Sequence, residues 1–341
     1  MNCSPFSKLR SGEYGPLCGL VGRLRRGIIG MVLLALLAGC RNFPSPQESY
    51  VGPQLPPNPT FEQIASFINT NSTQIRTVVA DQASLSSPGF PTLRSQILFE
   101  RPWRLRIRGE TSLSGLELDV GSNDELFWFW VKRNEPPAFY FCRYSDYDNP
   151  ASTARRVVPI DPRWLIEAVG ITELDVNAPH EGPVPLAGGR LEIRTQRPTP
   201  DGIMTKVTVV DAQYGLILAQ YLYDPQGRLV ASAVSYDHRR EPVTGLVLAR
   251  TVEINVPASG MVLRLNLGNA RINEPIPNPS LTWNMPVYPG YPMVNLADPR
   301  NLSGISVVAC PSRGTAQGPV APFTGVEGGS GQGLTWLPIP Q

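Results

Sequence analysis

Histidine is nearly absent from this sequence of 341 residues, which contains only His180 and His238. Neither has a second histidine, a cysteine or an acidic residue at the spacing of a metal site. No Gly-x-Ser-x-Gly nucleophile elbow occurs, and no glycine-rich phosphate loop follows an expected strand. The sequence therefore predicts no catalytic residue, no metal site and no cofactor, and we expect a protein that is not an enzyme.

Charge is also scarce, with 17% charged residues and a formal net charge of +2 at pH 7. Because nucleic-acid-binding domains carry a pronounced basic excess, no nucleic acid partner is expected. Hydrophobic residues reach 42%, which is enough for a sizeable core. The 36 prolines and 31 glycines favour a β-rich body with many turns.

The apolar run of residues 28–37 is too short to span a membrane, because a transmembrane helix needs about 20 apolar residues. Arg23, Arg25 and Arg26 precede this run, and Gly39 and Cys40 follow it. A basic start, a short apolar run and small residues are typical of a secretory signal peptide. We therefore predict a signal peptide over residues 1–39.

The tetrad Leu37-Ala38-Gly39-Cys40 resembles the lipobox of bacterial lipoproteins. The resemblance implies that Cys40 is acylated, becomes the first residue of the mature chain and anchors it in membrane lipid. Arg41 follows the cysteine instead of aspartate, and by the same resemblance this favours the outer membrane, with the protein facing the periplasm. Of the remaining cysteines in the mature chain, Cys142 and Cys310 either pair or stay free.

The rest of the chain divides into three parts by composition. Residues 40–59 are rich in proline and predict an extended tether. Residues 60–297 carry the periodic apolar patterns of a folded domain, and residues 298–341 predict an irregular or disordered tail. Thr60 and Gln63 have the spacing of a capping box, so we expect a long amphipathic helix over residues 60–82.

Most of the folded part alternates with period two, which is typical of strands. In residues 103–108, Leu105 and Ile107 lie on one face and three arginines on the other. We expect Arg104, Arg106 and Arg108 to form a solvated face balanced by acids such as Glu117 and Asp119, and a docking surface for acidic groups is the alternative. Residues 126–131 are apolar on both faces, which predicts a strand covered on both sides.

The predicted fold is α+β: a large curled antiparallel sheet of about eleven strands, forming a half-barrel. The long N-terminal helix and a short helix that starts near Asp161 are expected on its concave side. Such a sheet with an amphipathic helix over it can enclose a cavity for an apolar ligand. The candidates for lining this cavity are Trp103, Leu105, Ile107, Phe127, Phe129, Phe67 and Ile68, and filling a closed core is the default role for the aromatic ones.

This layout resembles the LolA/LolB-like superfamily of lipoprotein carriers, which have an unclosed β-barrel and a helical lid. The resemblance rests on the leading helix, the strand of residues 103–108, residues 118–124 leading into Phe127-Trp128-Phe129-Trp130, the turn at residues 223–228, and Trp283-Asn284-Met285-Pro286 followed by Val294-Asn295-Leu296. It implies that acyl chains bind between the sheet and the lid.

The function expected from these observations is that of a monomeric, membrane-anchored lipoprotein. It would bind or transfer an apolar ligand, the acyl chain of a lipid or lipoprotein, while the helix of residues 60–82 moves aside. The alternative is a structural or scaffolding outer-membrane lipoprotein that acts by protein contacts and binds no ligand.

Overall fold

The computed structural model describes residues 52–199 and 201–302. The predicted signal peptide, Cys40, the first part of the tether and most of the predicted tail lie outside these residues. No helix within the described residues is long and apolar enough to cross a membrane.

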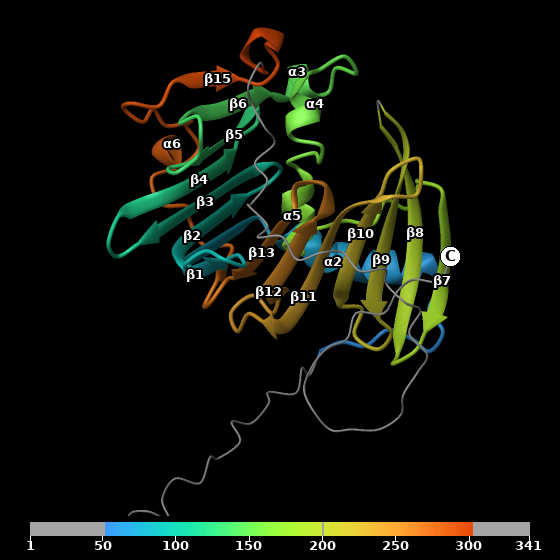
Figure 1. Cartoon of the computed structure of the whole chain (residues 1–341). Helices are drawn as coiled ribbons and strands as arrows, with labels where there is room; N and C mark the ends of the chain where they lie inside the picture. The colour runs from blue at the N-terminus through green and yellow to red at the C-terminus, as the bar shows by residue number, and fades with distance from the viewer. Residues whose placement is uncertain (1–51, 200, 303–341) are drawn as a thin grey trace, which may run out of the picture. The chain divides into compact units, whose positions relative to one another are not determined.

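A single sheet of fifteen strands dominates the described part of the chain (Figure 1). Its spatial order is β15-β6-β5-β4-β3-β2-β1-β13-β12-β11-β10-β9-β8-β7, and β14 pairs with β1. The pairs are antiparallel, except that β15 runs parallel to β6. The sheet is unclosed, because β15 and β7 stand at opposite ends of this order.

The strands follow one another along the chain in two meanders. The first contains β1 (Thr77–Ser86), β2 (Leu93–Glu100), β3 (Arg104–Thr111), β4 (Gly115–Ser122), β5 (Leu126–Val131) and β6 (Phe139–Arg143). The second contains β7 (His180–Leu186), β8 (Arg190–Thr199), β9 (Gly202–Asp211), β10 (Ile217–Tyr223), β11 (Leu229–Arg240), β12 (Val247–Val256) and β13 (Met261–Asn266), followed by the short β14 (Arg271–Ile272) and β15 (Met293–Asn295). The pairing of β1 with β13 joins the two meanders.

The sequence underestimated the number of strands. About eleven strands were expected, and the sheet has fifteen. One of the fifteen, β7, contains Pro183 and Pro185, which a strand at the end of a sheet tolerates. Strands β14 and β15 are only two and three residues long, too short to show an alternating pattern. The mostly antiparallel, mostly β architecture is as predicted.

The leading helix, α2 (Phe61–Gln74), begins as predicted and ends earlier. Thr60 Oγ1 accepts a hydrogen bond from the Gln63 amide, and the Gln63 side chain accepts one from the Thr60 amide. The expected end at residue 82 is wrong, because β1 begins at Thr77. The β-branched Val78 and Val79 pair there with β2 and β14, which lie far from α2 in sequence.

The connector between β6 and β7, residues 144–179, contains three short helices: α3 (Tyr144–Tyr147), α4 (Ala154–Val157) and α5 (Trp164–Ala168). Figure 1 shows these helices between the two halves of the sheet. Helix α5 is the short helix expected near Asp161, and it begins three residues later. The remaining helices are α6 (Pro279–Thr282) and the 3₁₀ turns Pro257–Ser259 and Pro299–Leu302.

One face of the sheet, which we call the inner face, is apolar across many strands. We define it as the face that carries Leu105 and Ile107, and we call the opposite face, which carries Arg106, the outer face. Rows of paired residues show how far the inner face extends: Ile97, Ile107, Val120 and Phe129 across β2 to β5, and Leu85, Leu265 and Val252 across β1, β13 and β12.

Candidate functional site

The largest buried apolar cluster lies between the inner face and α5, and we call it the central cluster. From the connector it includes Trp164, Ile166, Ala168, Val169 and Ile171. From the sheet it includes the large side chains Ile97, Phe99, Leu105, Ile107, Leu222, Val252, Ile254 and Leu265, and the small side chains Ala80, Ala83, Ala231 and Ala233. The alanines allow the connector to approach the sheet closely, so one short stretch of the connector buries a wide apolar surface.

The predicted lining residues, except Trp103, lie in three separate clusters. Leu105 and Ile107 belong to the central cluster. Phe127 and Phe129 lie on the same inner face but pack in a separate cluster with Tyr144 and Tyr147 of α3. Trp103 was expected to point inward, but it precedes β3 and is 43% exposed, because Arg101 and Pro102 place it in a turn.

Phe67 and Ile68 belong to a third cluster, in which α2 covers β8 to β10. Phe61, Ile64, Ala65 and Ile68 pack there against Leu191, Ile193, Val210 and Ile217. Leu55, from the predicted tether, is buried in the same cluster. The element over Leu105 and Ile107 is therefore the connector with α5, and not the leading helix that the sequence suggested.

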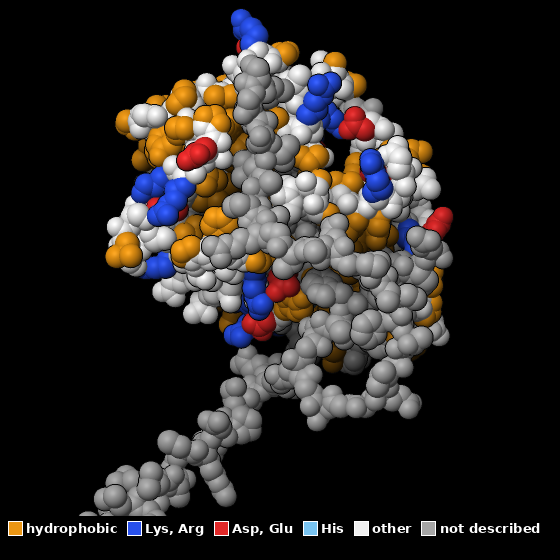
Figure 2. Space-filling view, viewed as in Figure 1, with side chains coloured by type: hydrophobic (Ala, Val, Ile, Leu, Met, Phe, Trp, Pro, Cys, Tyr) orange, Lys and Arg blue, Asp and Glu red, His pale blue; other side chains and the backbone are white. Residues whose placement is uncertain are grey.

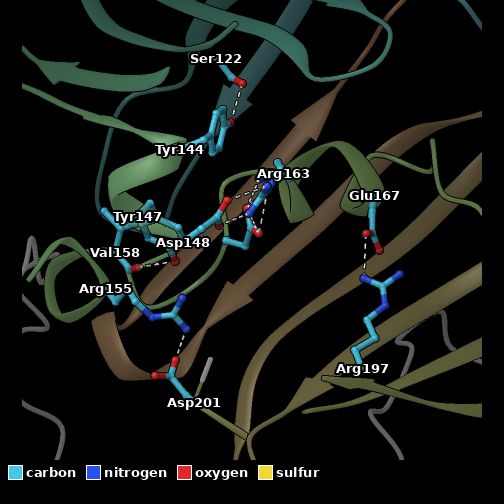
Figure 3. A network of polar contacts seen from close by, with 11 residues as sticks. Ser122, Tyr144, Tyr147, Asp148, Arg155, Val158, Arg163, Glu167, Arg197 and Asp201 are labelled. Carbon is cyan, nitrogen blue, oxygen red and sulfur yellow. Dashed lines mark hydrogen bonds and ion pairs between the residues drawn. The ribbon is translucent and has the colours of Figure 1, made fainter. Parts of the chain in front are cut away.

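Partly exposed ion pairs lie within the connector and between the connector and the sheet (Figure 3). Arg163 Nη2 lies 2.6 Å from Asp148 Oδ1 and 2.7 Å from Asp161 Oδ2, and its guanidinium lies over the Tyr144 ring. Arg155 of α4 pairs with Asp201 at the turn before β9. These pairs are partly exposed, so each contributes only about 0–1 kcal/mol to stability.

A buried ion pair holds α5 itself. The ammonium of Lys206, on β9, is 2% exposed and donates to Glu167 Oε2 and to Thr172 Oγ1. Arg197 Nη1 lies 2.8 Å from Glu167 Oε1 (Figure 3). Burial alone would raise the pKa of Glu167, but the two cations outweigh it and lower this pKa to about 2. Burial lowers the pKa of Lys206.

This buried pair was missed at the level of sequence. In a strand over residues 205–211, alternation puts Lys206, Thr208 and Val210 on one face. A lysine on the same face of a strand as an apolar residue such as Val210 indicates a buried charge. Its partner Glu167 is 39 residues away, and no local pattern identifies it.

On the outer face, the expectation of a solvated arginine face is wrong for Arg106, which is only 7% exposed. Its Nη2 lies 2.7 Å from Asp119 Oδ2, and its Nε lies 3.1 Å from Asp119 Oδ1. Asp119 also accepts hydrogen bonds from Tyr288 and from the Trp128 indole. The expected balance by acids is confirmed for Arg106 with Asp119, whereas Arg108 is half exposed.

The cover over this arginine comes from residues 276–297, which follow the second meander. Arg106 Nη1 lies 2.8 Å from the Thr282 carbonyl oxygen. Tyr288 and Tyr291 pack on Trp130, which confirms the prediction that residues 126–131 are covered on both sides. Leu281, Val287 and Met293 remain exposed, and Figure 2 shows hydrophobic side chains over α6 and β15.

A surface pocket of about 320 Å³ lies where α6 meets the turn between β4 and β5. Its lining residues are mostly polar or charged: Arg104, Asn123, Asp124, Glu125, Pro279, Ser280, Trp283 and Asn284. Such walls do not suit an acyl chain. The apolar surface suited to one is the central cluster.

Cys142 is buried on β6, and burial raises the pKa of its thiol to about 12. It forms no disulfide within the described residues, and Cys310 lies outside them. A thiol of this kind is unreactive near neutral pH.

No protein-family model and no curated protein matches the sequence. Among solved structures, an outer membrane lipoprotein-sorting protein domain from Vibrio parahaemolyticus has a TM-score of 0.41 and 10% identity, covering 65% of this chain and 97% of that one. A LolA superfamily protein from Nitrosomonas europaea has a TM-score of 0.37 and 11% identity, covering 65% and 97%. A DUF1329 family protein from Desulfovibrio piger has a TM-score of 0.41 and 15% identity, covering 63% and 92%.

Two of these solved structures are named as a lipoprotein-sorting domain and a LolA superfamily protein, the group that the sequence resembles. The case for a function depends on the contacts within this chain.

Proposed function

We propose that this protein is a membrane-anchored lipoprotein that binds or transfers the acyl chain of a lipid or lipoprotein. The chain would lie between the inner face and the connector. The observation that carries the proposal is the central cluster, in which a wide apolar surface of an unclosed sheet is covered by a connector whose helix there, α5, has only five residues.

The sheet residues of the central cluster can be covered either by the connector or by an acyl chain, and the two covers differ in free energy. In the described state, Trp164, Ile166 and Ile171 bury the sheet residues. An acyl chain contributes about 0.8 kcal/mol for each buried methylene, so a long chain can replace these contacts. Opening the connector breaks the partly exposed ion pair of Arg155 with Asp201, which stabilises it weakly. It also breaks the buried pair of Glu167 with Lys206, which is the larger cost that the acyl chain has to offset.

The location of the proposed site follows from the sequence. Acylation of Cys40 would anchor the chain in the outer membrane, and the proline-rich residues 40–59 would separate the folded part from the lipid surface. This arrangement would hold an acyl-binding surface on the periplasmic side of the membrane. We propose that the protein acts there as a monomer.

A scaffolding lipoprotein is the second candidate, and the burial of the central cluster favours it. Ala231, Val252 and Ile254 are each at most 1% exposed. If the connector never leaves the sheet, this cluster is simply a core. The protein would then act through contacts on its surface.

The first test looks for bound lipid and for saturable binding. The full chain is purified from cells and extracted with solvent, and the extract is analysed by mass spectrometry. Binding of methyl oleate is then measured in detergent-free buffer by displacement of a neutral fluorescent probe. Noncovalent lipid or saturable binding is expected, whereas the absence of both would favour the scaffold.

Adjacent residues of β13 provide a matched pair of variants. Leu263 packs against the central cluster, and Val262 points outward and is 38% exposed. We expect Leu263→Trp to weaken methyl oleate binding about tenfold, because one blocked contact of about 1.4 kcal/mol has this effect. Val262→Trp should leave it unchanged. Equal affinities in the two folded variants would place the binding elsewhere.

A further inference from the structure

The inner face is not uniformly apolar, because a band of polar side chains crosses it between the central cluster and the cluster under α2. The band lies on β8, β9 and β10, and consists of Arg197, Lys206, Thr208 and Gln220. Thr208 and Gln220 are direct cross-strand partners, and Lys206 lies two residues from Thr208 on the same face. Leu222, beside Lys206, already belongs to the central cluster.

Two atoms of this band have no hydrogen-bond partner among the described residues: Thr208 Oγ1 and Gln220 Oε1. Both side chains belong to residues that are at most 1% exposed. Burying an unpaired polar atom costs about 1–3 kcal/mol. A band of this kind, placed at the border of an apolar surface, is suited to the polar end of an amphipathic ligand.

The connector already places a carboxylate in this band. Glu167 of α5 accepts hydrogen bonds from Lys206 and Arg197, and its backbone carbonyl accepts one of 2.7 Å from Gln220 Nε2. When α5 leaves, Arg197 stays on β8, where its side chain is already 34% exposed to solvent in the closed state. Lys206 Nζ, Gln220 Nε2 and the Thr208 hydroxyl are then donors on one face without Glu167.

We infer that Lys206 is the receptor for the carboxylate of a long-chain fatty acid, and that Glu167 occupies this place while the connector is closed. The inference rests on the proposed function and names the ligand class. When Glu167 departs, the positive charge of Lys206 has lost its partner, and one ligand carboxylate balances it. A phosphate monoester, with a charge of about −1.5 to −2 at pH 7, would exceed it.

The alternative is that a water molecule satisfies Thr208 and Gln220 and that the band has no ligand. The two cases differ in what they predict for a charged head. Oleic acid and methyl oleate share one chain, so the ratio of their affinities isolates the contribution of the carboxylate. With a bridging water only, this ratio should be close to one.

The experiment measures both affinities for the full chain by displacement of a neutral fluorescent probe. For the wild-type protein we expect oleic acid to bind about tenfold more tightly than methyl oleate. The reason is that only the acid accepts a charge-assisted hydrogen bond from Lys206. Lys206→Met should remove this preference, so that the ratio of the two affinities falls to about one. Glu167→Gln should increase the affinity for the acid, because the competing carboxylate is gone.

Arg264→Met, on the outward side of β13, is the control and should keep the preference, because Arg264 is 57% exposed. Thr208→Val is a nearly isosteric second variant that should reduce the preference, and it decides the matter if Lys206→Met does not fold. Equal wild-type affinities for acid and ester, or a preference that survives Lys206→Met, would overturn the inference alone. If neither compound binds, the proposed function fails together with it.

Discussion

At the scale of single residues, two buried ion pairs attach irregular segments to opposite faces of one sheet. Lys206 pairs with Glu167 and so holds α5 on the inner face. On the outer face Arg106 and Asp119 pair across β3 and β4. Arg106 also donates to the Thr282 carbonyl, and Asp119 accepts from Tyr288, which holds residues 276–297 there. Removing one partner of a buried pair costs about 3–5 kcal/mol, because the other charge is left unpaired. These pairs therefore select which segment covers which face.

The pKa of Glu167 leads to a pH-dependent prediction. We expect Glu167→Gln to lower the free energy of unfolding by about 3 kcal/mol at pH 7, since one pKa unit corresponds to about 1.4 kcal/mol. The pKa is about 2 in the folded protein and ordinarily 4.5. The stabilisation is thus complete above pH 4.5 and is lost as the pH falls toward 2.

Urea unfolding of the wild-type protein and the variant at pH 7 and pH 3 measures this difference. It should shrink by more than half at pH 3. The control is Glu125→Gln, because Glu125 pairs with Arg143 on the surface and its side chain is 72% exposed. An equal difference at the two pH values would contradict the assigned role of the carboxylate.

The sequence predicted some side-chain directions and missed others. Alternation correctly placed Leu105 and Ile107 on one face and Arg106 on the other, because pleating is a local property of a strand. The burial of Arg106 was missed because its cover, near Thr282, comes about 176 positions later in the chain. No local pattern encodes such a contact.

At the scale of elements, the start of α2 was predictable and its end was not. The capping box of Thr60 and Gln63 is formed within four residues. The end of the helix depends on β1, whose partners β2 and β14 compete for the chain from Thr77 and Val78 onward. Tertiary pairing therefore overrides a helical spacing of apolar residues.

Strand β7 shows how the sheet ends on that side. It carries Pro183 and Pro185, which have no backbone N–H to donate to another strand. Prolines at an edge discourage pairing with a second chain. They are consistent with the monomer that we propose.

We expect the double variant Pro183→Val, Pro185→Val to associate into dimers or larger species, because it restores two donors at the edge. Size-exclusion chromatography with light scattering measures the mass. Pro225→Val, in the turn between β10 and β11, is the control and should keep the mass of the wild-type protein. A monomeric double variant would show that the prolines do not protect this edge.

At the scale of the whole molecule, the two meanders become one sheet through β1. This strand pairs with β2 on one side and with β13 and β14 on the other. Segments about 180 positions apart, such as Leu85 and Leu265, are thereby neighbours. The inner face is continuous only because β1 pairs with strands of both meanders. The proposed binding surface depends on the same pairing.

The predicted membrane anchor concerns the whole protein in its cell. We expect the wild-type chain to incorporate labelled palmitate and to sediment with the outer membrane, because acylation of Cys40 adds buried methylenes. Cys40→Ser should lose the label, while Cys142→Ser, at a buried thiol, should keep it. Label that persists in Cys40→Ser would disprove the assignment of the lipidation site.

The sequence by itself determined the local features: the alternating strands, the capping box at Thr60 and the predicted export signal. Each depends on residues within a few positions of one another. Only the tertiary structure decided that α5 covers the central cluster, that Lys206 meets Glu167 and that Arg106 is buried. These outcomes depend on contacts between distant segments, where burial and charge pairing act together and local propensity has no influence.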